Sequence, residues 1–301
     1  MIPESERIIK YILNPDYRFI IDSNRGKYDD LSDIEYIKRK FKAKLGYPLN
    51  LDDPKTFNEK LQWLKLNDRR PLYTRLVDKY AVKDYVAEKL GEQYIIPTLG
   101  VWENVDEIDF DALPDRYVLK CTHDSGGLVV CRDKKTLNIE NAKARLKRCL
   151  ERDYYCRYRE WPYRNVPHRI IAEKYMEDET GSLRDYKIFC FNGKPRFFKI
   201  DFDRYTAHRA NYYDTNLQLL PFGEAHYPPD PNRNLVIPDE MPEMLEKAEI
   251  LARDTTFSRI DFYDVDHNVY FGEITFYPAS GMGPFTPPEW DRKIGDMLSL
   301  E

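Results

Sequence analysis

Hydrophobic and polar residues alternate along two neighbouring segments near the C-terminus, residues 258–262 and 269–275. Alternation with a period of two predicts β-strands, and the polar run 263–268 between them predicts a hairpin. Side chains two positions apart share a strand face. Arg259 and Asp261 therefore lie on one face of the first strand, and Glu273 and Thr275 on one face of the second. A turn centred near residue 266 would set Arg259 roughly opposite Glu273.

This hairpin carries a cation and two carboxylates between apolar strands. Ionised groups are costly to bury unless they are paired or bind a metal. Two carboxylates beside an arginine suit Mg²⁺ and phosphate together. A purely structural arginine–glutamate pair across the strands is the competing interpretation, and the hairpin alone does not decide between the two.

Two further hairpins and one buried strand are predicted upstream. Residues 186–191 and 195–200 flank Asn192-Gly193, the strongest short turn signal in the chain. Residues 117–121 and 128–131 flank the turn 122–127, and residues 169–176 form a buried-looking strand.

Helices are predicted between these hairpins. Residues 1–50 are polar and helical in pattern, and Thr56 with Glu59 forms a capping box that opens a helix to about residue 66. Further helices are expected over residues 74–90, 139–155 and 241–254. Helices alternating with antiparallel hairpins predict an α+β chain of two or three lobes, and ligands commonly bind in the gaps between lobes.

Composition narrows the class of protein. The chain has 301 residues with 42% hydrophobic content, enough for one large or two medium domains. A net charge of −5 argues against a general nucleic-acid binder. Five cysteines without CxxC spacing argue against a disulfide framework or zinc site and favour a reducing, cytoplasmic location. No segment has the pattern of a signal peptide or a membrane span.

Several short motifs carry possible chemistry, and each has a plainer interpretation. Lys120 lies in an apolar strand just before Ser125-Gly126-Gly127, whose backbone N–H groups could approach a phosphate, although a simple hairpin turn also fits. Glu173 ends an apolar strand, which could be a plain strand end or a linker that meets an adenine. Asp185 and Lys187 share a face, as a surface ion pair would.

Two other features remain open in the same way. Lys79 lies in a predicted early helix, where a solvated face is the plainer interpretation. Three Asp-x-Asp triplets begin at residues 109, 201 and 264, and each could be a sugar-nucleotide metal site or a chance occurrence in an Asp-rich chain.

Taken together and in their order along the chain, these motifs resemble those of the ATP-grasp superfamily and, more narrowly, of the TupA-like ATP-grasp family. The likeness rests on residues 56–63, 77–80, 119–127, 185–193 and 270–276, and extends from about residue 30 to the C-terminus. That family is associated with teichuronopeptide and other bacterial surface-polysaccharide clusters. The resemblance implies an ATP-grasp fold in which two α+β lobes clasp ATP. The implied divisions are a helical cap (1–50), a pre-grasp region (51–115), a small lobe (116–175) and a large lobe (176–301).

The resemblance also implies roles for individual residues. Lys79 and Lys120 would hold phosphate oxygens, and Ser125, Gly126 and Gly127 would form a loop that closes over the triphosphate. Glu173 would meet the adenine amino group, Lys174, Tyr175 and Met176 would line the hinge, and Asp185 would contact the ribose. Lys187 would lie near the γ-phosphate or the carboxylate substrate, and Arg259 would steady the transferred phosphoryl group.

Metal and acceptor residues follow by the same likeness. Asp261 and Glu273 would bind Mg²⁺, with Thr275 where many ATP-grasp enzymes have asparagine, so the number of metal ions stays open. We also hypothesise that Arg204, Arg209 and Asn211, in a basic and aromatic segment, face the acceptor, although exposed loop arginines are as plausible.

The expected activity is an ATP- and Mg²⁺-dependent carboxylate–amine ligase that acts through an acyl phosphate and releases ADP and phosphate. It would join an amino acid to a uronic acid or to another precursor of a surface polysaccharide such as a capsule. The alternatives are a glycosyltransferase with a metal-bound sugar nucleotide, an ATP-dependent sugar kinase, or a non-catalytic glycan-binding protein. The oligomeric state stays open.

Overall fold

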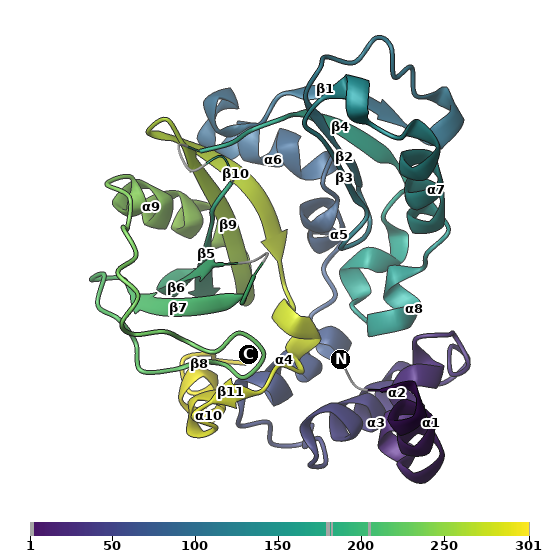
Figure 1. Cartoon of the computed structure of the whole chain (residues 1–301). Helices are drawn as coiled ribbons and strands as arrows, with labels where there is room; N and C mark the ends of the chain where they lie inside the picture. The colour runs from purple at the N-terminus through teal and green to yellow at the C-terminus, as the bar shows by residue number, and fades with distance from the viewer. Residues whose placement is uncertain (1–2, 179–180, 182, 204–205, 301) are drawn as a thin grey trace.

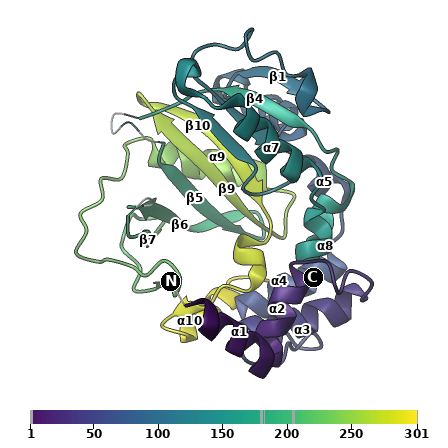
Figure 2. The same cartoon turned by 45° about the vertical axis from the view of Figure 1, so that its right-hand side comes forward.

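Two antiparallel sheets, one in each of two lobes, form the frame of the molecule (Figures 1 and 2). The structure is a computed structural model, and it describes residues 3–178, 181, 183–203 and 206–300. Helices cover the outer face of each sheet, and a group of N-terminal helices packs beneath both lobes (Figure 1). Mixed helix and antiparallel sheet agree with the predicted α+β class.

The smaller lobe contains a four-stranded sheet in the order β1-β4-β2-β3. Its strands are β1 (Thr98–Trp102), β2 (Tyr117–Cys121), β3 (Leu128–Cys131) and β4 (Ile170–Lys174). Helix α7 (Ile139–Leu150) packs on it, and Leu119, Leu146 and Ala172 belong to the core between them. The hairpin predicted around residues 122–127 is confirmed as β2–β3. Strand β1, from the 51–115 segment, also belongs to this sheet.

The larger lobe contains a five-stranded sheet in the order β10-β9-β5-β6-β7. Its strands are β5 (Asp185–Phe191), β6 (Lys194–Phe202), β7 (Arg209–Asp214), β9 (Phe257–Val265) and β10 (Asn268–Thr275). Helix α9 (Met241–Ala252) covers one face, and Leu251 of the helix and Ile188 and Ile260 of the sheet are fully buried. A small ladder pairs β8 (Gly223–Glu224) with β11 (Phe285–Thr286).

The turns β5–β6 and β9–β10 of the larger sheet each use two residues with positive φ. Asn192 and Gly193 have φ of 47° and 79°, and Asp266 and His267 have φ of 52° and 60°. Two consecutive left-handed residues match the right-handed twist of the flanking strands, which is why such turns join hairpins tightly. Both predicted hairpins are therefore confirmed.

Most of the remaining helices lie in the N-terminal third of the chain. The remaining helices are α1 (Glu4–Leu13), α2 (Pro15–Ser23), α3 (Asp33–Leu45), α4 (Phe57–Asn67), α5 (Pro71–Val77), α6 (Ala81–Leu90), α8 (Tyr154–Tyr158) and α10 (Glu289–Gly295). The predicted capping box at the start of α4 is confirmed, since Thr56 and Glu59 each accept a backbone N–H of the other. Short 3-10 turns are η1 (Glu92–Tyr94), η2 (Val105–Glu107), η3 (Lys134–Thr136), η4 (Trp161–Asn165) and η5 (Pro278–Gly281).

The helix predicted over residues 74–90 is broken in the structure, between Val77 and Ala81. Residues 74–90 were expected to form one helix, but the chain leaves α5 at Asp78 and begins α6 at Ala81. Asp78 Oδ1 accepts the N–H groups of Tyr80 (2.9 Å) and Ala81 (3.3 Å), and its Oδ2 pairs with Arg169 at 2.6 Å. The placement of Lys79 on a helix was therefore wrong, because this residue lies in the break.

Among the helices of the described part of the chain, none is both long and apolar enough to cross a membrane.

Candidate functional site

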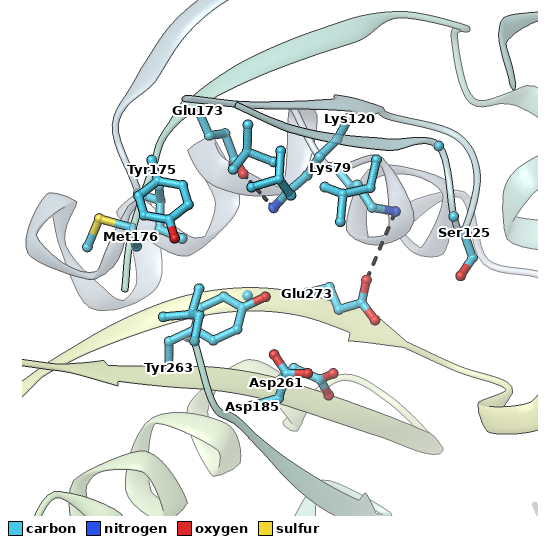
Figure 3. A pocket seen from close by; sticks show the side chains of 18 of the residues that line it. Lys79, Lys120, Ser125, Glu173, Tyr175, Met176, Asp185, Asp261, Tyr263 and Glu273 are labelled. Atoms are coloured by element: carbon cyan, nitrogen blue, oxygen red, sulfur yellow. Dashed lines mark ion pairs between the residues drawn. The ribbon is translucent and has the colours of Figure 1, made fainter. Parts of the chain in front are cut away.

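A cavity of about 350 Å³ lies between the two sheets and brings together most of the residues singled out from the sequence. Lysines and the glycine loop reach it from the small lobe, and carboxylates reach it from β5, β9 and β10 of the large lobe (Figure 3). The predicted residues that line it are Lys79, Lys120, Ser125, Gly126, Gly127, Glu173, Lys174, Tyr175, Met176, Asp185, Lys187, Asp261 and Glu273. We call it the first cavity.

On the small-lobe side, Glu173 is held between two lysines. Its two carboxylate oxygens lie 2.6 Å from Lys83 Nζ and 2.5 Å from Lys120 Nζ. Burial alone would raise the pKa of Glu173, but the two ammonium groups lower it to about 2, so it is ionised at neutral pH. In this structure Glu173 positions Lys120 over the cavity, as Figure 3 shows. Its contact with an adenine stays a prediction.

Lys83 was missed in the sequence. It lies four residues after Lys79 but beyond the helix break, and it also donates to the carbonyl oxygen of Ile96 at 2.6 Å. Its pKa is lowered by burial, although the neighbouring Glu173 opposes that effect. A second lysine within an apolar helix face was the available signal, because lysine is almost never buried without a partner.

The glycine loop is anchored at its base and exposed at its tip. Asp124 is 1% exposed, accepts the N–H of Gly127 at 3.2 Å and pairs with Arg152 at 3.2 Å. Lys79 Nζ donates to the carbonyl oxygen of Asp124 at 2.7 Å. Ser125 and Gly126 are exposed over the cavity, and Gly126 has a φ of 106° that favours glycine. The tip therefore lies open at the cavity, while the Gly127 N–H is already used to anchor the base of the loop.

His123, beside this loop, is part of the packing. It is 1% exposed, stacks on His168 with ring centroids 3.7 Å apart, and contacts the carbonyl oxygen of Cys149 at 3.1 Å. Burial lowers its pKa to about 4, so the ring is neutral at pH 7.

On the large-lobe side, Arg259 joins the two carboxylates of the β9–β10 hairpin. Its guanidinium donates to Asp261 at 2.7 and 2.8 Å and to Glu273 at 3.0 Å. Lys187 Nζ adds contacts to Asp185 at 2.7 Å and to Asp261 at 2.9 Å. Burial raises the pKa of Glu273, but Lys79 and Arg259 outweigh it and leave that pKa below its usual value.

The register of this hairpin differs from the prediction. Arg259 lies opposite Thr275, and Asp261 lies opposite Glu273, because the strand pairing shifts by one residue between Phe271 and Glu273. Gly272 is the extra residue, as in a β-bulge. Without the shift, the pairing of Phe271 with Phe262 would continue and set Glu273 opposite Ile260, on the core face. The bulge thus brings Glu273 onto the face of Asp261.

These residues fit a magnesium ion. Asp261, Glu273 and the Thr275 hydroxyl offer hard oxygen ligands, and the Glu273 side chain is 39% exposed. Mg²⁺ is usually held by one or two carboxylates together with substrate phosphates. The described residues contain no group of three or more histidine, cysteine, aspartate and glutamate side chains that could hold a metal by themselves. Phosphate oxygens would have to complete the set.

A second cavity of about 380 Å³ adjoins the first, and Lys79, Ser125 and Glu273 line both. Arg259 and Thr275 line this second cavity rather than the first. Its walls are rich in tyrosine and include one buried carboxylate. The relevant lining residues are Lys40, Tyr154, Tyr158, Glu160, Tyr163, Glu224, Tyr227, Tyr277 and Ser280. The two cavities therefore meet where Lys79 of one lobe forms an ion pair with Glu273 of the other.

Of the three residues hypothesised to face the acceptor, the structure describes Arg209 and Asn211. Arg209 and Asn211 lie on β7 and line neither of these two cavities. Asn211 is fully buried and exchanges two hydrogen bonds with Asp230, at 2.8 and 2.9 Å. Arg209 donates to the carbonyl oxygen of Pro229 at 3.4 Å. Arg204 lies outside the described residues.

Comparison with solved structures finds distant likenesses. D-alanine–D-alanine ligase from Bacillus anthracis, complexed with ATP, is 14% identical with a TM-score of 0.44, and the match covers 95% of this chain and 92% of that one. D-alanine–D-alanine ligase from Helicobacter pylori is 14% identical with a TM-score of 0.41, and covers 80% of this chain and 69% of that one. No curated protein sequence matches the chain.

Comparison with protein families is more decisive. The model of the TupA-like ATP-grasp family matches residues 59–299, which is most of the chain and includes every described residue that lines the first cavity. The chain belongs to the TupA-like ATP-grasp family.

Proposed function

We propose that this protein is an ATP- and Mg²⁺-dependent carboxylate–amine ligase. The observation that carries the proposal is the pair of adjoining cavities that share Lys79, Ser125 and Glu273. The first cavity has cations on one side and metal-binding oxygens on the other, as a nucleoside triphosphate requires. The second offers a separate space for the molecules to be joined.

The first cavity would hold ATP. Lys79 and Lys120 would bind phosphate oxygens, and the tip Ser125–Gly127 would cover the triphosphate. Lys174, Tyr175 and Met176, which follow β4, would border the base, with Asp185 near the ribose. Figure 3 shows Tyr175, Met176 and Tyr263 at one end of the cavity and Lys79 and Glu273 at the other, which supports this orientation.

Asp261, Glu273 and Thr275 would hold Mg²⁺, which would neutralise charge on the phosphate oxygens when bound. Arg259 and Lys187 would bind the transferred phosphoryl group and the carboxylate substrate. A carboxylate oxygen attacks the γ-phosphorus, its bond to phosphorus forms, and the bond from γ-phosphorus to ADP breaks. The amine nitrogen then attacks the acyl carbon, and phosphate leaves. Positioning and charge neutralisation would supply most of the rate.

We further propose a uronic acid or related surface-polysaccharide precursor as the carboxylate substrate and an amino acid as the amine. The tyrosines of the second cavity support a sugar-like occupant, because aromatic rings offer flat apolar faces with a polar edge. The substrate assignment otherwise depends on the association of the TupA-like family with surface-polysaccharide clusters. A fold by itself does not determine the substrate.

Calorimetry tests the nucleotide site. ATP with Mg²⁺ and UDP-sugars with Mn²⁺ are titrated into wild type, Lys120→Ala and the control Lys135→Ala, which removes an exposed lysine on η3. Micromolar ATP binding that is lost only in Lys120→Ala supports the proposal. UDP-sugar binding without an ATP signal contradicts it and favours the glycosyltransferase alternative.

The product distinguishes a ligase from a kinase. ADP release is measured with D-glucuronate or D-galacturonate, the common amino acids, or hydroxylamine, which traps an acyl phosphate as a hydroxamate. A hydroxamate or an amide supports the ligase. A stable sugar phosphate formed without an amine would establish the kinase instead.

A further inference from the structure

Glu160 is a buried carboxylate in the wall of the second cavity. It lies between α8 and η4, and it is 3% exposed. The other two glutamates of that wall are committed to cations. Glu273 pairs with Arg259 at 3.0 Å, and Glu224 pairs with Lys199 at 3.1 Å. No lysine or arginine nitrogen within the described part of the chain lies within 4.0 Å of the Glu160 carboxylate, and Lys65 is close enough only to act through its charge.

The turn opposite Glu160 is strained and firmly held. Ala279 and Ser280, in η5, have φ of 49° and 56°, which side chains other than glycine rarely adopt. A backbone conformation of this kind is energetically costly and persists only when its surroundings fix it. Lys65, fully buried beneath, donates to the carbonyl oxygen (2.9 Å) and to the hydroxyl (2.8 Å) of Ser280, and Gln62 donates to Gly281 at 2.6 Å.

This strain fixes the Ser280 side chain in the wall of the second cavity, which Glu160 also lines. The Ser280 hydroxyl accepts a hydrogen bond from Lys65, and it lowers the pKa of Glu160. A buried lysine, a serine and a carboxylate are thus gathered at one part of the cavity wall. A fixed side chain of this kind is typical of functional sites, where backbone strain is often retained.

The charged and titratable groups that face Glu160 come from several elements. Lys65 lies on α4 and Lys40 on α3, and the tyrosines are Tyr154 on α8, Tyr163 on η4 and Tyr277 beside η5. Burial raises the pKa of Glu160 to about 7, although Lys65, Ser280 and Lys40 oppose the shift. Lys40 is directed elsewhere, since its Nζ donates to the carbonyl oxygen of Arg157 and to Tyr36.

Tyrosine rings surround the same part of the cavity. The Tyr154 ring lies 4.7 Å from Tyr158 and 4.5 Å from Tyr163, centroid to centroid. A cation attracts the negative faces of aromatic rings, and the attraction grows when the site excludes water. A buried carboxylate with aromatic walls therefore suits an ammonium group.

We propose that Glu160 binds the ammonium group of the amine substrate in the second cavity and takes one of its protons. This inference rests on the proposed function, because an amine must lose a proton before it can attack an acyl phosphate. One N–H bond breaks as the proton moves to the Glu160 carboxylate. The C–N bond then forms, the bond from the acyl carbon to the phosphate oxygen breaks, and the departing phosphate takes the second proton from nitrogen.

The variant Glu160→Gln distinguishes proton transfer from the amine from the formation of the acyl phosphate. The variant keeps the shape of the side chain but cannot accept a proton. Hydroxylamine serves as the control nucleophile because its nitrogen is already uncharged at neutral pH. The matched control variant is Glu151→Gln, which changes an exposed carboxylate at the end of α7 by the same atoms.

With ATP and a uronate, we expect Glu160→Gln to form hydroxamate within about twofold of wild type. We expect amide formation from an amino acid to fall roughly 100-fold or more at pH 7, the usual effect of losing a general base, and to recover as pH rises. Glu151→Gln should match wild type with both nucleophiles. Amide formation by Glu160→Gln at the wild-type rate across the pH range would overturn the role of Glu160.

A second variant covers the case in which Glu160→Gln does not fold. Ser280→Ala removes the hydroxyl that lowers the pKa of Glu160, so the pH midpoint of amide formation should move upward while ATP affinity stays unchanged. An unmoved midpoint contradicts the inference. If wild type itself gives neither hydroxamate nor amide with either uronate, the proposed function fails instead, and this inference fails with it.

Discussion

Asp261 and Glu273 lie opposite each other on β9 and β10 and share one arginine, since Arg259 Nη2 lies 2.8 Å from the first carboxylate and 3.0 Å from the second. The arginine holds two like charges together that would otherwise repel each other. It also lowers the pKa of Glu273, the carboxylate that lines both cavities. Substituting one carboxylate at a time therefore tests the role of each.

Glu273→Gln and Asp261→Asn should each lower turnover roughly 100- to 1,000-fold at saturating ATP, as losing one positioned electrostatic group does. Each removes one negative ligand, so higher Mg²⁺ should restore part of the lost activity. ADP release measured against Mg²⁺ concentration checks this. The control is Glu249→Gln, a partly exposed carboxylate on α9 that lines neither cavity. An unchanged Mg²⁺ dependence in both site variants would exclude these residues as ligands.

Gly272→Ala should damage the site by straining the bulge. An added Cβ would lie 3.0 Å from the carbonyl oxygen of Asp261 and 3.1 Å from the ring of Tyr263. We expect the free energy of unfolding to fall by about 1–3 kcal/mol, as in other overpacked sites, and Mg²⁺-dependent activity to fall with it. Urea unfolding followed by circular dichroism measures the first effect. A variant with the wild-type midpoint and activity would show that the bulge tolerates a side chain.

Glu173 should make stability depend on pH in the acid range. Its pKa in the folded protein, about 2, lies below its usual 4.5, so its contribution is complete above pH 4.5 and is lost as pH falls toward 2. That shift corresponds to about 3 kcal/mol. Unfolding free energies of wild type and Glu173→Gln are compared between pH 7 and pH 3.

The difference between these two proteins should be largest near neutral pH and should shrink below pH 4.5. A constant difference down to pH 3 would show that Lys83 and Lys120 do not set the pKa of Glu173. Glu88→Gln, an exposed carboxylate on α6, controls for the general effect of acid on the chain.

Tyr154→Ala should raise the KM for the acceptor at least tenfold while ATP affinity stays within twofold, because Tyr154 lines the second cavity and not the first. Arg209→Ala should leave both values near those of wild type if the acceptor occupies that cavity. Initial rates at saturating ATP measure the first constant, and calorimetry measures ATP binding. A raised KM in Arg209→Ala together with an unchanged KM in Tyr154→Ala would instead show that the acceptor binds near Arg209.

Much of this architecture could be predicted from local patterns. The Asn192-Gly193 turn and the capping box at Thr56 are encoded within a few residues, so the sequence predicts them well. The break at Asp78 has a local cause too, but its carboxylate is also held by Arg169, which is distant in sequence. Tertiary contacts of this kind are invisible to a pattern of hydrophobic residues.

The β9–β10 register shows where such reasoning fails. A regular strand over residues 269–275 would place Glu273 on the same side as Phe271, which is buried. The available signal was the apolar spacing, which changes from two residues (Val269 to Phe271) to three (Phe271 to Ile274) across Gly272. The second cavity had no such signal, because its wall combines segments from α3, α8, η4 and η5 that only the fold brings together.

The shared wall formed by Lys79, Ser125 and Glu273 has a thermodynamic consequence. We expect an occupant of either cavity to contact these three side chains, so that filling one cavity changes the affinity of the other. Linkage makes that coupling reciprocal: the factor by which nucleotide alters acceptor binding equals the factor by which acceptor alters nucleotide binding. Lys79 also holds the glycine loop through Asp124, so this one lysine connects loop position to the occupancy of both cavities.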